Sequence, residues 1–177
     1  MKYLMILTIG VCLVLSTAMV AQETPKPAPE LKKLDSQAGK WTWEGEMKPG
    51  PMGPGGKFTS KDTCEWFEGG FALICRSEGQ GPTGPTKSMG ILSFDSSKSV
   101  YTYYGVENMS PPGGSEGTVE GDTWTWHWEA NVDGKAMKFR FTLKMPSPTS
   151  QTTKAEYAVD GGPWTTMMEA KGTKEGH

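Results

Sequence analysis

Few side chains in this sequence could carry out acid–base, nucleophilic or metal chemistry. The chain has two histidines, His127 and the terminal His177. A catalytic Ser-His-Asp or Cys-His site would therefore have to use His127. We expect His127 to lie on the surface beside Arg140, and the alternative is that it binds haem or a metal as an axial ligand. No second His, Cys or carboxylate cluster accompanies it at the spacing of a metal site, so we predict no catalytic residue, no metal and no cofactor.

A pair of cysteines is better suited to a structural bond than to redox chemistry. Cys64 and Cys75 stand on either side of Gly69-Gly70, and a hairpin centred on these glycines places the two cysteines directly opposite each other. A redox-active pair would favour a Cys-x-x-Cys motif at the start of a helix, and the sequence has no such motif. We therefore predict a disulfide, which would stabilise so short a loop by roughly 2–3 kcal/mol.

A pair of glutamates and a pair of methionines are of residue types that could form a reactive or metal-binding site, but their surroundings do not suit one. Glu44 and Glu46 share one face of an expected strand, without the apolar surroundings that an acid–base pair of carboxyls needs. Met52 and Met109 lie in two expected loops, and two thioethers without Cys or His are weak evidence for a soft-metal site. We interpret the glutamates as a solvated face and assign no metal to the methionines.

The stretch from residue 123 to residue 145 predicts a β-hairpin whose register can be read residue by residue. Asp133-Gly134 is the dipeptide typical of a type I′ turn, because both of its positions need a positive φ. The large apolar residues then face one another on one side: Trp124 and Leu143, Trp126 and Phe141, Trp128 and Phe139. The polar residues share the other side: Thr125 and Thr142, His127 and Arg140, Glu129 and Lys138. A shift of one residue would destroy this sorting, so the sequence predicts an antiparallel sheet with one apolar face.

Ten strands are expected to follow one short helix at residues 29–38. The first strand begins at Gly39 and carries Trp41, Trp43, Gly45 and Met47 on one face. The other strands are expected at residues 57–67, 71–78, 88–94, 99–106, 115–119, 123–130, 135–145, 151–159 and 164–171. Long loops rich in Pro and Gly, at 48–56, 79–87 and 107–114, alternate with tight turns and would gather at one end of a meander. So large a meander would expose sheet edges unless it closed, and we therefore predict an all-β, up-and-down antiparallel β-barrel.

Three short motifs resemble a known family. They are Gly39-Lys40-Trp41, Glu68-Gly69-Gly70-Phe71 and Met89-Gly90-Ile91-Leu92-Ser93-Phe94-Asp95. A short helix before a Gly-x-Trp at the first strand resembles the calycin superfamily of lipocalins and fatty-acid-binding proteins. The set of motifs more closely resembles the exported bacterial proteins grouped as domain-of-unknown-function family 1579, over residues 30–171. The resemblance implies a calycin-like barrel and no particular activity.

The lipocalin pattern also makes an expectation for the closed end of the barrel. In lipocalins an Arg on the last strand packs over the indole of the Gly-x-Trp motif. The last expected strand here has no Arg, and we expect Lys171 to place its ammonium over Trp41 as a cation–π substitute. The predicted structural residues of the closed end are therefore Gly39, Trp41 and Lys171.

The N-terminal 21 residues have the pattern of a secretory signal peptide, with Lys2, an apolar run from Leu4 to Leu15 and small residues up to Ala21. The apolar run is too short to span a bilayer comfortably, so we favour export to the periplasm or medium over a membrane anchor. We expect a linker at 22–28, the barrel at 29–171 and a tail at 172–177. The chain has 18 basic and 20 acidic residues, without a basic stripe, and we predict neither a nucleic-acid partner nor a membrane span after cleavage.

The apolar face of the sheet supplies the predicted binding residues: Trp43, Met47, Trp124, Trp126, Trp128, Phe139 and Phe141. Such residues often form a plain core, but a barrel of ten strands is too wide for its own side chains to fill completely. We therefore favour non-enzymatic binding of a small, mostly apolar ligand inside the barrel. Two alternatives stay open: a structural or protein-interaction role in the cell envelope with a filled barrel, and an enzyme that uses haem at His127 or an interior Glu as acid or base.

Overall fold

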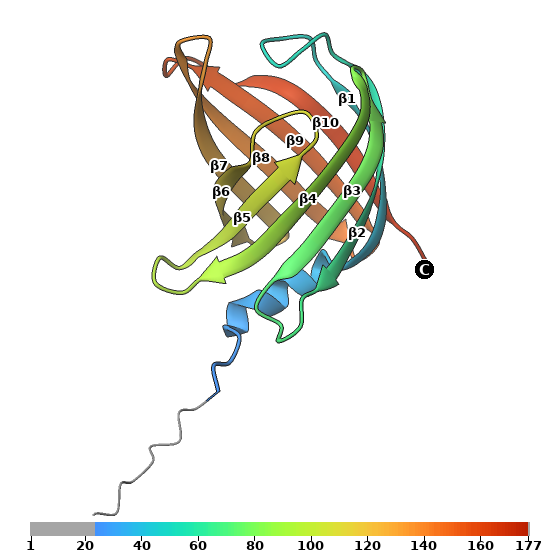
Figure 1. Ribbon diagram of the computed structural model, residues 1–177, viewed down its shortest axis with the longest axis vertical. Helices are drawn as coiled ribbons and strands as arrows, with labels where there is room; N and C mark the ends of the chain where they lie inside the picture. The colour runs from blue at the N-terminus through green and yellow to red at the C-terminus, as the bar shows by residue number, and fades with distance from the viewer. Residues whose placement is uncertain (1–23, 177) are drawn as a thin grey trace, which may run out of the picture.

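Ten antiparallel strands form a closed ring in the part of the chain that the structure describes (Figure 1). The computed structural model describes residues 24–176, and the predicted signal peptide at residues 1–21 lies outside them. The strands are β1 (Gly39–Met47), β2 (Gly56–Trp66), β3 (Leu73–Gly81), β4 (Gly84–Asp95), β5 (Val100–Glu107), β6 (Gly113–Glu120), β7 (Thr123–Val132), β8 (Lys135–Ser147), β9 (Ser150–Val159) and β10 (Thr165–Lys174). Each strand pairs with the next, and β1 pairs with β10. The predicted up-and-down β-barrel is confirmed.

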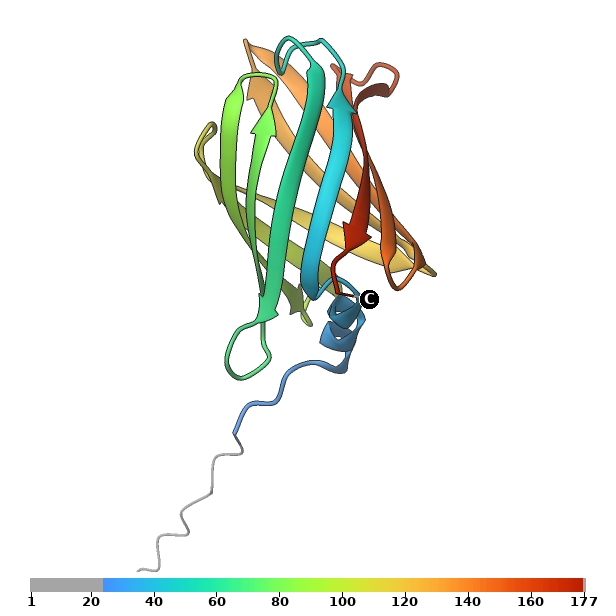
Figure 2. The ribbon, with the colours of Figure 1, turned by 90° about the vertical axis from the view of Figure 1, so that its right-hand side faces the viewer.

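The connections between strands agree with the prediction at one long loop and contradict it at another. The β1–β2 loop, residues 48–55, is long and lies at the end of the barrel opposite the helix (Figure 2). The predicted loop at 79–87 is wrong, because β3 and β4 stay paired as far as Gly81 and Gly84 and turn at Pro82-Thr83. Pro82 has the fixed φ that suits a turn, and Gly84 has a φ of 125°, which glycine adopts readily. Here Pro and Gly mark a tight turn between two strands rather than a loop.

The β7–β8 hairpin has the predicted register. Trp126 pairs with Phe141, and His127 pairs with Arg140 on the other face. Asp133 has a φ of 51° at the turn, as a type I′ turn requires. The alternation of apolar and polar residues along both strands therefore places one complete set inside the barrel and the other outside.

A short 3-10 helix, η1 (Pro29–Ser36), covers one end of the barrel (Figures 1 and 2). Leu31 and Leu34 are 4% and 0% exposed, and their spacing matches the three residues per turn of such a helix. They belong to a core cluster with Leu73 and Leu92. Apolar packing therefore holds the helix against the barrel. No helix within residues 24–176 is long and apolar enough to cross a membrane.

Trp41 anchors this closed end, but its cationic partner differs from the predicted one. The Trp41 ring is 2% exposed, and its Nε1 donates a hydrogen bond of 3.0 Å to the Gln37 carbonyl oxygen. The Nζ atom that lies over the ring, 5.4 Å from its centroid, belongs to Lys174. Lys171 is exposed and pairs with Glu44 on the outer face. Because side chains alternate along a strand, β10 turns Lys174 inward and Lys171 outward, and β10 itself extends beyond residue 171.

Candidate ligand cavity inside the barrel

A cavity of about 380 Å³ lies inside the barrel. It extends from Gln37, directly after η1, to Phe58, near the start of β2. It therefore runs from the helix-covered end toward the end that carries the β1–β2 loop. Its lining includes a group of aromatic residues, called here the aromatic wall, and a row of polar residues, called the polar wall.

The aromatic wall comes from β1, β7 and β8. Trp43, Trp126, Trp128 and Phe141 line the cavity. Trp126 and Phe141 are cross-strand partners, and Trp126 is 5% exposed. Trp126 also stacks on Trp124, with ring centroids 6.2 Å apart and planes at 8°. Neighbouring rings hold one another in place, so this wall offers a ligand a preformed apolar surface.

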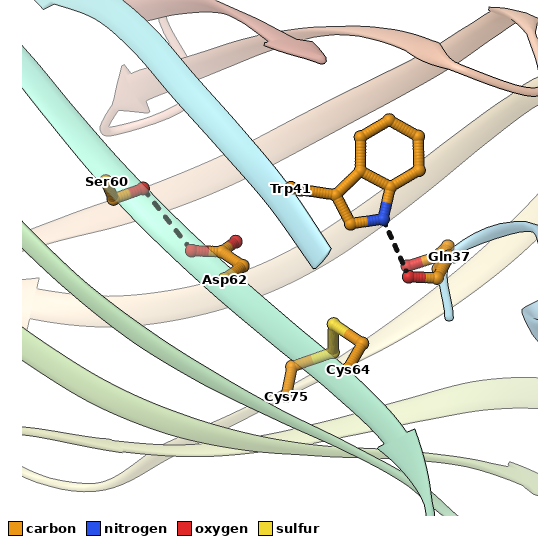
Figure 3. The surroundings of a disulfide bond; sticks show 6 residues. All are labelled: Gln37, Trp41, Ser60, Asp62, Cys64 and Cys75. Carbon is orange, nitrogen blue, oxygen red and sulfur yellow. Dashed lines mark hydrogen bonds between the residues drawn. A yellow bond between two sulfur atoms is a disulfide. The ribbon is translucent and has the colours of Figure 1, made fainter. Parts of the chain in front are cut away.

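The polar wall comes from β2, β3 and β4. Asp62 pairs with Ser77, and Ser77 pairs with Ser88, so these residues form one row across three strands. All three line the cavity, as does Ser60, whose Oγ donates a hydrogen bond of 3.3 Å to Asp62 Oδ1 (Figure 3). In the order of strands around the ring, β2 and β3 stand across from β7 and β8. The polar row therefore lies across the barrel from Trp126, Trp128 and Phe141, whereas Trp43 on β1 is the cross-strand neighbour of Ser60.

Asp62 is a carboxyl group inside this cavity. Burial raises its pKa above the ordinary value, although the nearby Ser77 hydroxyl, the hydrogen-bonded Ser60 hydroxyl and the Trp43 indole N–H act in the opposite direction. Asp62 takes part in none of the salt bridges found within residues 24–176. A carboxylate moved out of water without a cation opposes folding, so stability alone does not explain an acid at this position.

Three polar side-chain atoms in the described chain are buried without a hydrogen-bond partner: Gln37 Nε2, Trp43 Nε1 and Gln151 Nε2. All three residues line the cavity, and Gln151 is 3% exposed. Trp43 Nε1 is near enough to Asp62 to lower the pKa of its carboxyl, but the two groups lack the geometry of a hydrogen bond. A buried donor left unpaired costs about 1–3 kcal/mol, so the cavity presents polar groups that a ligand can satisfy.

The predicted disulfide forms part of the cavity wall. Cys64 and Cys75 are cross-strand partners of β2 and β3, with their Cα atoms 4.0 Å apart. Figure 3 shows the bond close to Asp62, which precedes Cys64 by two positions on the same strand. Asp62 and Ser77 are the next inward-facing pair of these strands. The disulfide therefore fixes β2 against β3 beside the polar row.

The structure places the predicted binding residues in three environments. Trp43, Trp126, Trp128 and Phe141 meet at the cavity, as described. Trp124 is 2% exposed in the core cluster with the η1 leucines, and Phe139 is 2% exposed with its ring stacked 5.0 Å from that of Trp128. Met47 lines a separate, smaller pocket beside the β1–β2 loop.

The histidine, glutamate and methionine residues that the sequence offered as acid–base or metal-binding candidates lie away from this cavity. His127 is exposed, opposite Arg140 on the outer face. Glu46 is also exposed and forms a salt bridge of 3.0 Å with Lys48. Met52 and Met109 are each 51% exposed. Residues 24–176 contain no group of three or more His, Cys, Asp or Glu side chains that could hold a metal ion.

Asp62 and Gln151 are cavity residues that the sequence-based prediction missed. The sequence did contain a signal for Asp62. Side chains two positions apart on a strand lie on the same face, so an inward-facing Cys64 implies that Asp62 also faces inward. The same parity places Ser60 and Phe58 inside. Gln151 has no comparable neighbour in the sequence, and its position follows only from the β9–β10 register, in which it pairs with Gly172.

Comparisons with known proteins identify a family and a fold. A family model described as "Protein of unknown function (DUF1579)" matches residues 26–174. No curated protein matches the chain. The crystal structure of Rv2717c from M. tuberculosis is similar, with a TM-score of 0.58 and 13% identity, over 85% of this chain and 100% of that one. The S-type phycobiliprotein lyase CPES from Guillardia theta is also similar, with a TM-score of 0.56 and 13% identity, over 82% of this chain and 92% of the lyase.

The two structural likenesses, at 13% identity, show the fold alone. The family model, in contrast, spans η1 and all ten strands of the barrel, including the cavity walls and the disulfide. The chain belongs to the DUF1579 family of proteins of unknown function.

Proposed function

We propose that this protein binds a small, mostly apolar molecule in the cavity of its barrel and does not transform it. The observation that carries the proposal is a cavity of about 380 Å³ whose lining combines rigid aromatic rings with three buried polar atoms that lack a hydrogen-bond partner. Ligand sites in proteins are usually preformed, largely apolar hollows of roughly 300–1,000 Å³ with a few convergent polar groups. The cavity has this size and this composition.

The contents of the cavity favour binding over catalysis. Its ionisable groups are Asp62 and Tyr103. The lining holds no histidine and no second carboxyl to complete a proton-transfer pair with Asp62, and burial raises the pKa of Tyr103, which keeps its hydroxyl protonated. The similar fold of a phycobiliprotein lyase does not decide between a carrier and an enzyme, because one fold can support unrelated functions.

The proposed location is outside the cytoplasm, in the periplasm or the medium. The intramolecular disulfide is consistent with an oxidising compartment, where such bonds persist. The signal-like N-terminal sequence supports the same location. Sequencing the N-terminus of protein recovered from its own host tests this proposal, and an intact Met1 on cytoplasmic material contradicts it.

A solvatochromic apolar dye tests the binding function. We expect saturable binding of one dye per folded chain, with energy transfer from Trp126 because this ring lines the cavity. Dye that binds only to partly unfolded protein contradicts the proposal and favours a filled, structural barrel. Native mass spectrometry of protein from its own host would then look for the natural ligand.

A cavity-filling variant identifies where the dye binds. Ala170→Phe adds a ring to a residue of the cavity lining and should abolish dye binding. Ala136→Phe makes the same change at an exposed position beside the β7–β8 turn and should leave binding intact. Gly45 is a poor choice, because a Cβ there would lie 2.5 Å from the Glu169 carbonyl oxygen. Thermal unfolding of both variants verifies that they fold, and dye binding that survives in folded Ala170→Phe contradicts the assigned site.

A further inference from the structure

The polar wall of the cavity holds one acid and no base. The lining residues include Asp62, and no Lys, Arg or His is among them. Asp62 is half-buried, and carboxylates withdrawn from water are usually paired with a cation or fully hydrogen-bonded. Asp62 accepts a hydrogen bond from Ser60 but forms no ion pair within residues 24–176. The cavity therefore contains a carboxylate, that of Asp62, with which no cationic side chain of the described chain forms an ion pair.

The surroundings of Asp62 suit an organic cation rather than a hydrated metal ion. Trp43 and Trp126 line the same cavity, and aromatic faces attract cations through their negative π surfaces. The neighbours of the Asp62 carboxylate are hydroxyls and an indole N–H, which leave a metal ion with too few oxygen ligands. The aromatic wall can instead cover the apolar body attached to a charged nitrogen.

The same charge pattern disfavours an anionic ligand. A fatty acid or another carboxylate would meet Asp62 without any basic side chain in the lining to balance its charge. Gln151 is 3% exposed, and its unpaired Nε2 can bind a polar, uncharged substituent elsewhere on the ligand. The lining thus favours a ligand with one positive nitrogen over an acid.

We propose that the ligand is an amphipathic amine, whose protonated nitrogen pairs with the Asp62 carboxylate while its apolar body lies against Trp43, Trp126 and Phe141. This inference rests on the proposed binding function and names the chemical class of the ligand. An amine donates hydrogen bonds directly to the carboxylate, and such charge-assisted bonds are stronger than neutral ones. In the complex, the protonated amine supplies the positive charge that the Asp62 carboxylate lacks in the protein alone.

Competition between matched probes tests the ligand class. Phenylbutylamine, phenylbutanol and phenylbutyrate share an apolar body and differ in charge, and each is titrated against the cavity-bound dye. We expect the amine to displace the dye at a concentration about tenfold lower than the alcohol, with the carboxylate weakest. An alcohol or a carboxylate that competes as well as the amine overturns the inference.

A charge-removing variant assigns the preference to Asp62. Asp62→Asn keeps the shape of the side chain and should abolish the advantage of the amine over the alcohol, with both probes measured against the dye affinity of that variant. Asp133→Asn makes the same change at the exposed β7–β8 turn, where Asn also tolerates a positive φ, and should keep the amine preference. An amine preference that persists in Asp62→Asn overturns the assignment.

The unmodified protein offers a second measurement that does not depend on a variant that folds. Amine affinity should fall as the pH decreases through the pKa of Asp62, whereas the affinity for the alcohol should stay constant. The groups around Asp62 are Trp41 and Trp43 on β1, Ser60 on β2, Ser77 on β3, the disulfide between β2 and β3, and Tyr103 on β5, and of these Tyr103 alone can titrate. The Lys174 ammonium of β10 lies beyond them, over the Trp41 ring. Burial raises the pKa of Tyr103, so its titration lies far above this range. Parallel pH profiles for the two probes overturn the inference.

Failure of this inference is distinguishable from failure of the binding function. Saturable dye binding without any amine preference overturns the ligand class and leaves the binding function standing. A folded protein that binds neither the dye nor any of the three probes overturns the binding function and the ligand class together.

Discussion

Trp126 lies flat against Gly117, its cross-strand partner on β6. A Cβ atom at Gly117 would come 2.5 Å from the Trp126 ring, so only glycine leaves room for the indole in this position. Trp43 has the same relationship with Gly172 on β10, where a Cβ would lie 2.9 Å from the ring. Two of the tryptophans that form the aromatic wall are therefore positioned by glycines on neighbouring strands.

The first prediction concerns this contact. Gly117→Ala should destabilise the protein by about 1–3 kcal/mol, because the added methyl group forces the Trp126 ring out of place. Urea denaturation monitored by tryptophan fluorescence measures the effect. Gly113→Ala on the same strand is the control, since a Cβ there would meet no atom within 4 Å. Equal stability of the two variants would show that the ring has room to move.

The second prediction separates the inner and outer faces of β8. Phe141→Ala should destabilise by roughly 3 kcal/mol or more, because it removes a large ring from the interior. Lys138→Ala should change stability by less than about 1 kcal/mol, because its salt bridge of 3.3 Å with Glu129 is exposed to solvent. Arg140 is not a neutral control, because it contacts both Glu156 and the Trp164 ring. Chemical denaturation that gives similar values for both variants would contradict the assignment of faces.

The third prediction concerns the pH dependence that Glu156 imposes on stability. Burial tends to raise the pKa of Glu156, but hydrogen bonds from Lys154 and Arg140 outweigh burial and hold it below the ordinary value. A carboxyl with a lowered pKa stabilises the fold above its unfolded-state pKa, and this stabilisation is lost as the pH falls through its folded-state pKa. Glu156→Gln should therefore lose stability near neutral pH and show a weaker dependence on acid. Denaturation curves over the acidic range test this, and an unchanged pH profile would contradict it.

The fourth prediction has the opposite sign and concerns Asp62. Its pKa is raised, so the empty protein binds a proton at this site more tightly than the unfolded chain does. Stability should fall as the pH rises from the unfolded-state pKa through the folded-state pKa. Asp62→Asn should accordingly be more stable than the parent protein at neutral pH, and the gain should disappear in acid. A less stable Asp62→Asn protein at neutral pH would show that the carboxylate supports the fold.

The fifth prediction concerns the disulfide. Exported protein should show no free thiol at Cys64 or Cys75 when it is labelled without reduction, because the two residues are bonded. The Cys64→Ser, Cys75→Ser double variant should lose roughly 2–3 kcal/mol of stability, according to the chain-entropy description of such bonds. Labelling of both thiols in unreduced exported protein would contradict the bond.

Local signals in the sequence were sufficient for much of the fold. The turn dipeptide at Asp133 and the alternation around Trp126 define a register that the structure reproduces pair by pair. The cysteine spacing likewise predicts the Cys64–Cys75 pairing. In these hairpins each strand pairs with its neighbour in the sequence, so turn geometry and side-chain parity suffice.

Other features depended on contacts between distant segments or on ambiguous residue types. Pro82 and Gly84 suit either a loop or a tight turn, and the continued pairing of β3 with β4 decides for the turn. The cation over Trp41 is Lys174 because of the β1–β10 register, which no local signal defines. Asp62 was overlooked because an acidic residue in a strand is more often solvated, and only its parity with Cys64 places it inside.

The pairing of β1 with β10 that closes the ring also has a consequence for folding. Every other strand pair is a hairpin, which can form as soon as its own two strands are available. The β1–β10 pair joins the two ends of the sheet. Bringing these strands together closes a loop that contains all the other strands, and the chain must lose the corresponding conformational entropy before the β1–β10 hydrogen bonds form. Until that step, β1 and β10 are both exposed edges that another chain could extend. The interval before closure is therefore the period in which a growing or refolding chain is most open to aggregation.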